Sequence, residues 1–194
     1  MRTFKIVLAG DGGVGKTTLL DAFRLGKFFQ HKATIGLSIS LCTVNLGRGV
    51  KCKLIVYDFS GQPRFMRLAH EIPRILRGAQ GAILVFDLSS FATLLVLDQW
   101  ADIIRRVNGD IPIILVGTKA DLEPEVGEDD IREFAERLGA RAFVKTSSKL
   151  MLNVDKPFKL LVQMMMERQE AYTPLAVRFM SSEIRMKAED GQSG

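Results

Sequence analysis

The feature that most constrains the fold is a glycine-rich segment, Gly10–Thr17 (GDGGVGKT), which separates a β-rich run from a helical one. It matches the phosphate-loop pattern at every fixed position. The apolar run Phe4–Ala9 precedes it as a strand, and a helix is expected over Lys16–Leu25. Glycines let the backbone fold closely around a polyphosphate with its N–H groups turned inward, and the start of a helix adds a positive dipole end. The segment therefore predicts a strand, loop and helix that together bind phosphate groups.

The remaining chain alternates short β-rich runs with helical periods, which is typical of a mostly parallel sheet with helices on both faces. Leu37–Leu46 and Val50–Asp58 are separated by a glycine-containing turn, so these two strands should pair antiparallel. Further strands are expected at residues 81–86, 111–116 and 141–145, and further helices near residues 90–107, 128–138 and 154–171. The three methionines of the last helix are interpreted as core residues. We predict an α/β fold of the P-loop NTPase class, with a six-stranded mostly parallel sheet and one antiparallel strand.

Composition narrows the class of protein. The 194 residues suit one domain, and a hydrophobic fraction of 47% is enough for a sizeable core. The 27 basic and 22 acidic residues are scattered, which argues against a nucleic-acid groove. Cys42 and Cys52 could lie near each other on a hairpin, but reduced core thiols are the favoured interpretation, and such sparse cysteine suits the cytosol. No apolar run approaches the ~20 residues needed to cross a bilayer. We expect a cytoplasmic protein, with peripheral membrane contact left open.

A second group of residues could handle a metal ion and the terminal phosphate. Asp58 ends a strand, where its carboxylate could hold Mg²⁺ directly or through water. Gly61 could turn its N–H toward a γ-phosphate, and Gln62 could orient an attacking water. Thr34 lies in the loop before the second strand and could ligate Mg²⁺, although alone it would more often be an ordinary loop residue.

A third group predicts recognition of the base. Thr118–Asp121 (TKAD) follows a buried strand, and the carboxylate of Asp121 could accept two hydrogen bonds from the N1–H and amino group of guanine. Adenine offers no such pair of donors, so this contact separates GTP from ATP. The stem of Lys119 could lie over the base plane. Thr146–Lys149 (TSSK) ends the last strand, where backbone N–H groups could meet the guanine O6.

Taken together, these motifs resemble the Ras superfamily of small GTPases over roughly residues 3–170. Residues 61–65 (GQPRF) and 34–36 (TIG) look most like the Rab branch. Thr118 is similar to the variant of the Rho branch, but the helical insert typical of Rho proteins has no room after Asp121. The sequence departs from the family pattern by two substitutions and by a loop before Thr34 that is about one residue short. Pro63 replaces an acidic residue, which bears on the response to exchange factors, and Ser148 replaces an alanine.

The resemblance implies a set of site residues. The catalytic residues would be Gln62, Lys16 and Thr34, and the Mg²⁺ ligands would be Thr17, Thr34 and Asp58. Because the loop before Thr34 is about one residue short, the aromatic contact to guanine would be Phe28 or, alternatively, Phe29. The nucleotide-binding residues would be Asp11, Gly12, Gly13, Val14, Gly15, Lys16, Thr17, Thr18, Phe28, Thr34, Asp58, Gly61, Thr118, Lys119, Asp121, Ser147, Ser148 and Lys149.

The resemblance also implies a mechanism and partners. Water would attack the γ-phosphate in line, and the protein would mainly position that water and stabilise charge. No arginine finger is evident, so we expect slow intrinsic hydrolysis that an activating protein accelerates. Residues 27–37 and 59–74 would be ordered by GTP and read by protein effectors, and exchange factors would replace GDP with GTP.

The carboxyl-terminal part leaves the resemblance. We expect a G domain over residues 1–171 and a partly mobile extension over residues 172–194. The sequence has no C-terminal cysteine, so no lipid anchor of the Rab or Ras type is expected; either the protein works without a lipid, or its natural end lies beyond this sequence. Two other functions remain open from the sequence. One is an interaction module with bound nucleotide and negligible hydrolysis, and the other is a phosphate-loop kinase.

Overall fold

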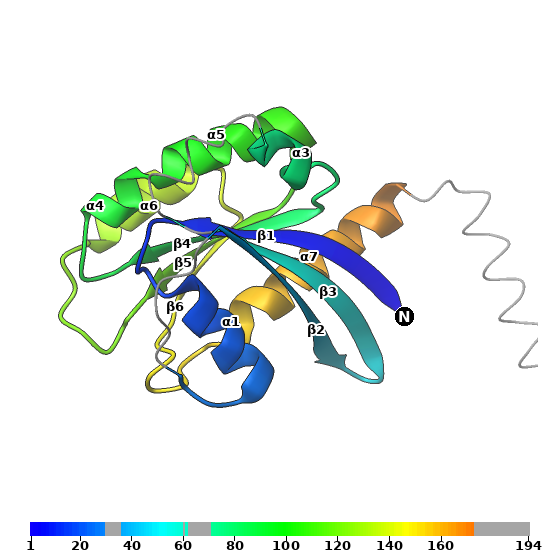
Figure 1. The fold of residues 1–194 in the computed structure, drawn as a ribbon, viewed down its shortest axis with the longest axis horizontal. Helices are drawn as coiled ribbons and strands as arrows, with labels where there is room; N and C mark the ends of the chain where they lie inside the picture. The colour runs from blue at the N-terminus through cyan, green and yellow to red at the C-terminus, as the bar shows by residue number, and fades with distance from the viewer. Residues whose placement is uncertain (30–35, 60, 62–70, 173–194) are drawn as a thin grey trace, which may run out of the picture.

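The computed structural model describes residues 1–29, 36–59, 61 and 71–172 (Figure 1). The strands are β1 (Arg2–Gly10), β2 (Leu37–Gly47), β3 (Val50–Phe59), β4 (Gly81–Asp87), β5 (Ile113–Thr118) and β6 (Ala142–Lys145). The helices are α1 (Lys16–Leu25), α3 (Ile72–Leu76), α4 (Ala92–Leu95), α5 (Leu97–Asn108), α6 (Glu128–Arg137) and α7 (Lys156–Tyr172). None of the helices in these ranges has the length and apolar character that crossing a bilayer requires.

The strands form one six-stranded sheet in the order β2-β3-β1-β4-β5-β6. Among the strand pairs of the described residues, β2–β3 alone is antiparallel, as the sequence predicts. The turn between these strands needs left-handed backbone at three successive residues, and two of them are the glycines Gly47 and Gly49. Cys42 lies opposite Leu54 in this hairpin and so is not cross-strand to Cys52, which is buried in the core.

Each face of the sheet is covered by its own helices. In Figure 1, α1 and α7 lie on one side, and α3, α5 and α6 lie on the other. Phe23 of α1 stacks on Phe158 of α7 with ring centroids 4.4 Å apart. On the opposite face Trp100 of α5 packs against Phe59 at the end of β3, with centroids 5.4 Å apart. Met165 belongs to the α7 core with 2% of its surface exposed, which confirms its interpretation as a packing residue.

The short helix α3 was not predicted, and two predicted elements differ from the structure in ways that have a local explanation. The helix expected over residues 90–107 is divided into α4 and α5 at Val96, whose own φ and ψ of −69° and −18° are helical, so the break is one residue wide. Strand β5 begins at Ile113 instead of Ile111 because Pro112 has no N–H to donate to a neighbouring strand. The carbonyl of Pro112 still accepts a hydrogen bond of 3.0 Å from the N–H of Ala82.

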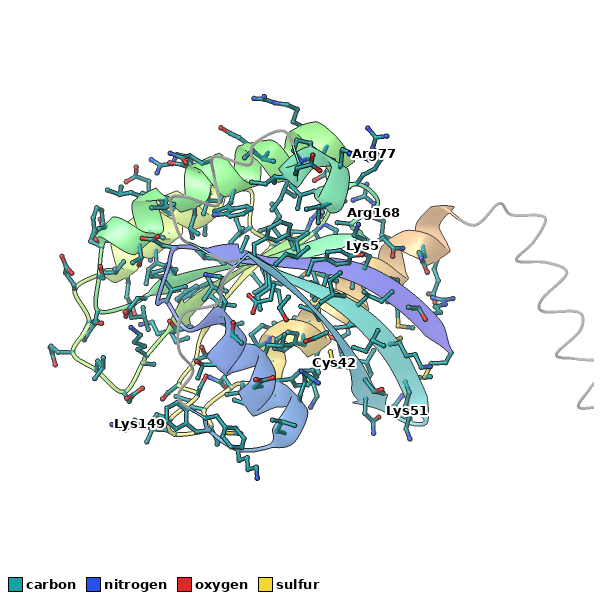
Figure 2. The ribbon with its side chains drawn as sticks, viewed as in Figure 1. Lys5, Cys42, Lys51, Arg77, Lys149 and Arg168 are labelled. Atoms are coloured by element: carbon teal, nitrogen blue, oxygen red, sulfur yellow. The ribbon has the colours of Figure 1, made fainter. Side chains whose placement is uncertain are left out.

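The short helix α3 is fastened to the sheet by a lysine. Lys5 of β1 donates from Nζ to the carbonyl oxygens of Ile75 at 2.6 Å and Arg77 at 2.7 Å. Its ammonium also lies 4.3 Å from the centroid of the Tyr57 ring. Figure 2 shows Lys5 and Arg77 on the same side of the molecule, away from the loop that carries Lys149. These contacts fix the carboxyl end of α3.

Candidate functional site

The predicted site residues gather at one edge of the sheet. Strands β1, β3, β4, β5 and β6 run parallel, so their carboxyl ends meet at the same edge, where ligands bind in open α/β sheets. The register places Asp58 of β3 beside Leu8 of β1, and Asp87 of β4 beside Thr118 of β5. The loops after β1, β5 and β6 therefore approach one another although they are far apart in the sequence.

The loop after β1 needs glycine for two different reasons. Gly10 has a φ of 147°, and a Cβ there would lie 2.0 Å from the carbonyl oxygen of Val85, so no larger residue fits against β4. Gly13 and Gly15 have φ values of 74° and 93°, in the left-handed region that side chains rarely adopt. This backbone reverses the chain and starts α1 at Lys16, where the N–H groups of the first helical turn and the helix dipole favour an anion.

Lys16 lies inside this loop. Its side chain is only 6% exposed, and Nζ donates to the carbonyl oxygens of Gly10 at 3.0 Å and Asp11 at 2.5 Å. Burial lowers the pKa of Lys16 to about 8, and the negative charges of Asp58 and Asp11 oppose that shift. Burial disfavours the charged form of this lysine, and the negative charge of bound phosphate groups would favour it again.

Thr17 and Asp58 meet although 41 residues separate them. The Thr17 hydroxyl donates to Oδ2 of Asp58, and the Asp58 carboxylate is fully buried at the end of β3. A hydroxyl and a carboxylate oxygen are the hard oxygen ligands that Mg²⁺ prefers, and Mg²⁺ is usually bound by one or two protein oxygens together with water and phosphate. The two residues thus fit a magnesium site beside the phosphate loop.

Gly61 lies against the phosphate loop. A Cβ at this position would be 2.0 Å from the carbonyl carbon of Asp11 and 2.2 Å from the nitrogen of Gly12, so only glycine allows this approach. Gly61 is thereby in direct backbone contact with the loop that follows β1. The predicted roles of Thr34 and Gln62, and the change at Pro63, concern residues outside the described part of the chain.

A pocket of about 460 Å³ joins the phosphate loop to the predicted base-binding motifs. Phe28 lines it, whereas the ring of Phe29 lies 5.0 Å from the ammonium of Lys27. The pocket also includes Leu122, which the sequence analysis did not select although it follows Asp121 directly. The lining residues are Gly13, Val14, Gly15, Thr18, Phe28, Thr118, Lys119, Asp121, Leu122, Ser148 and Lys149.

The walls of this pocket are tied to the phosphate loop by Thr118. Its buried hydroxyl lies 2.6 Å from the carbonyl oxygen of Val14 and 2.9 Å from that of Phe86. A side-chain hydrogen bond between two loops more than a hundred residues apart fixes their separation, which sets the distance between a phosphate and a base bound to them. Thr118 thus has a structural role that its place in the motif did not reveal.

Asp121 is oriented by the last loop. Its Oδ1 accepts a hydrogen bond of 2.5 Å from the Ser147 hydroxyl, and its Oδ2 lies 3.9 Å from Nζ of Lys149. The backbone N–H of Ser147 donates to the carbonyl of Leu152 at 3.1 Å. Of the residues in this turn for which a guanine contact is predicted, Ser148 and Lys149 line the pocket, whereas the N–H of Ser147 is already bonded. Figure 2 shows Lys149 on the side of the molecule away from Lys5 and Arg77.

Lys119 has a partner that sequence reasoning missed. Its φ is 56°, and its ammonium forms an ion pair with Asp87 at the end of β4. Burial raises the pKa of Asp87, but hydrogen bonds from Lys119 and Ser89 outweigh that effect, so the pKa lies below its ordinary value. The sequence did contain one indication of this contact. Asp87, like Asp58, lies at the carboxyl end of a buried parallel strand, so both residues must lie at the same edge of the sheet.

Known proteins have sequences similar to this one. The Ras family model matches residues 5–167. The chain is 34% identical over 185 residues to Ras-related protein RABA2a of Arabidopsis thaliana, a match that covers 93% of this chain and 80% of that protein. It is 36% identical over 164 residues to Ras-related protein Rab-25 of Homo sapiens, covering 82% and 75%. It is 36% identical over 160 residues to Ras-related protein Rab-11A of Dictyostelium discoideum, covering 80% and 72%.

The family model spans the sheet from β1 to within α7, so the match includes every loop that contributes to the pocket. The relatives named above are Rab proteins, in agreement with the Rab-like motifs of residues 34–36 and 61–65. The chain belongs to the Ras family, close to its Rab branch, and is a small GTP-binding protein that hydrolyses GTP.

Proposed function

We propose that the protein is a molecular switch in which GTP orders residues 27–37 and 59–74 and hydrolysis releases them. The observation that carries this proposal is the contact of Gly61 with the backbone of Asp11 and Gly12. Because no side chain separates these segments, a change at the phosphate loop is transmitted directly to the chain that follows β3. Protein effectors would bind the surface that these two segments form in the GTP state.

The phosphate end of the site is assigned as follows. Gly10–Thr17 would surround the β- and γ-phosphates, and Lys16 would neutralise part of their charge. Thr17 and Asp58, which already contact each other, would hold Mg²⁺ together with Thr34. Bound Mg²⁺ would offset charge on the phosphate oxygens. Gln62 would position the attacking water.

The base end of the site is assigned to the pocket of about 460 Å³. Asp121 would accept hydrogen bonds from the N1–H and amino group of guanine, with Ser147 holding its carboxylate. Lys119 and Phe28 would contact the purine, and backbone N–H groups of the loop after β6 would meet O6. The same aspartate would reject adenine, because adenine offers neither the N1–H nor the amino group that guanine would donate to this carboxylate.

Three further assignments belong to this proposal. Residues 1–171 form the G domain and residues 172–194 an extension, supported by a family match that ends at residue 167. Activating proteins supply a missing cation, worth ~10³–10⁵ in hydrolysis rate, and exchange factors promote release of GDP. The protein would work in the cytoplasm, because its two cysteines are free thiols and sparse, unpaired cysteine suits a reducing compartment. Peripheral contact with a membrane is the alternative.

The test is the nucleotide content and turnover of the purified protein. Chromatography of the denatured protein should reveal GDP or GTP, and multiple-turnover phosphate release should be slow and should require Mg²⁺. Asp121→Asn should remove the preference for GTP over ATP in competition. A switch also requires different conformations in its two states, so hydrogen exchange of residues 27–37 and 59–74 should be slower with a non-hydrolysable GTP analogue than with GDP. Equal exchange in the two states would exclude the switch while leaving GTP binding intact.

A further inference from the structure

The ammonium of Lys119 is held from outside the base-binding loop. It forms an ion pair with Oδ2 of Asp87, which lies 32 residues earlier in the sequence at the end of β4. The Lys119 side chain is 39% exposed, whereas that of Asp87 is 9% exposed. The lysine stem therefore runs from the pocket wall to a fixed, nearly buried anchor.

The anchor is itself fixed by its own turn. Oδ1 of Asp87 accepts hydrogen bonds from the N–H of Ser89 at 2.9 Å and from the Ser89 hydroxyl at 2.7 Å. The backbone N–H of Asp87 donates to the Thr93 hydroxyl at 3.0 Å. Since Ser89 occupies Oδ1 from one side, the carboxylate presents Oδ2 toward Lys119. The ion pair thus has a defined geometry in place of the loose one typical of surface pairs.

The two turns involved are also joined through their backbones. The N–H of Leu88 donates to the carbonyl of Thr118 at 3.1 Å, and the carbonyl of Leu88 accepts from the N–H of Glu125 at 2.9 Å and of Val126 at 3.2 Å. The turn after β4 therefore supports the loop after β5 at both of its ends. Within the described residues, the side chain of Asp87 links this turn to Lys119 of the pocket lining.

We propose that Asp87, held by Ser89, is a positioning residue for nucleotide binding. It fixes the Lys119 ammonium so that the aliphatic stem of Lys119 stands as a preformed wall of the purine pocket. This inference rests on the proposed assignment of that pocket to guanine. Asp87 itself would not touch the nucleotide.

The physical basis is preorganisation. An unrestrained lysine side chain occupies many rotamers, and ordering it on binding costs conformational entropy. In this chain the ion pair orders the side chain before the nucleotide arrives. Loss of the anchor would move that cost into the binding step, and it would also let the stem leave the base. We expect nucleotide dissociation on the order of tenfold faster without the anchor.

The experiment measures release of fluorescent GDP from the full chain after addition of excess unlabelled GDP. Asp87→Asn keeps the size of the side chain and removes its charge, and it should accelerate release on the order of tenfold. Ser89→Ala removes only one of the bonds to the anchor and should cause a smaller acceleration in the same direction. Asp110→Asn is the matched control. Asp110 forms an exposed ion pair of 3.0 Å with Arg141, and neither residue lines the pocket. This variant should release GDP at the wild-type rate.

A double-mutant cycle separates positioning from a general loss of structure. Lys119→Met keeps an apolar stem without an ammonium, so Asp87→Asn should have no further effect on release in that background. An Asp87→Asn effect of the same size in both backgrounds would overturn the proposal, as would unchanged release in both the Asp87→Asn and Ser89→Ala proteins. A wild-type chain that fails to bind fluorescent GDP would instead refute the assignment of the pocket. Thermal unfolding of each variant checks that it is folded.

Discussion

Protonation of Lys16 should be coupled to nucleotide binding. Burial lowers the pKa of Lys16 to about 8, so near pH 8 about half of the molecules would carry a neutral amine when no phosphate is bound. Phosphate oxygens favour the charged form and should return the pKa toward 10 or above. Binding should therefore take up about 0.1 proton at pH 7 and about 0.5 proton at pH 8.

The sign of the effect on affinity follows from the same values. The free protein loses the ammonium as pH rises through about 8, whereas the bound protein keeps it, so the affinity falls as the pH rises. If only the charged form binds, the dissociation constant should increase about fourfold between pH 7 and pH 8.5. Below pH 7 this group should cause little change, because Lys16 is then charged in both states.

The assay is calorimetric titration of nucleotide-stripped protein with GDP and Mg²⁺ at pH 8.0, below the range in which guanine N1–H itself titrates. Two buffers with different ionisation enthalpies give the number of protons taken up. Lys16→Arg should abolish the uptake, since an arginine stays charged. Lys51→Arg is the matched control, because Lys51 is exposed at the tip of the β2–β3 hairpin (Figure 2) and should leave the uptake unchanged. Equal heats in both buffers for wild-type protein that still binds GDP would refute the reasoning.

Four substitutions test other parts of the site. Gly61→Ala would place a Cβ 2.0 Å from backbone of the phosphate loop, so single-turnover hydrolysis should slow by tenfold or more, on the order of 1.4 kcal/mol in the barrier; an unchanged rate would mean that this contact is dispensable. Gln62→Leu should slow the same step by about 10² or more, and a wild-type rate would remove its proposed role. Thr118→Val removes a buried hydroxyl that lies within hydrogen-bonding distance of the carbonyl oxygens of Val14 and Phe86 and can donate to one of them, so it should lower the free energy of unfolding by about 1–3 kcal/mol in a denaturant titration. Asp121→Asn should weaken GTP binding by on the order of 10² or more and reduce discrimination against ATP, measured by competition with fluorescent GDP.

The sequence predicted most of the fold because each element carries its own local pattern. The glycine-rich loop fixed the start of α1 at Lys16, and glycines on both sides of Arg48 marked the antiparallel connection between β2 and β3. The start of β5 was misplaced because the apolar run through Pro112 hides a missing N–H. Nothing in the local pattern marked the break at Val96.

For the site, the sequence identified residues but not the bonds that hold them. Contacts within a motif follow from spacing, whereas the ion pair of Lys119 with Asp87 depends on the register of β4 and β5. The contact of the Thr118 hydroxyl with the Val14 carbonyl of the phosphate loop likewise depends on how two loops pack in space. Side chains that support a binding loop from a neighbouring strand therefore required the structure.

The most direct measurement of the central claim is a crystal structure of the full chain with GDP and Mg²⁺. We expect the β-phosphate within Gly10–Thr17, Mg²⁺ on the Thr17 hydroxyl, and the guanine base beside the Lys119 stem with its N1–H and amino group on Asp121. A nucleotide bound elsewhere, or a base in this pocket that makes no contact with the Asp121 carboxylate, would contradict the account.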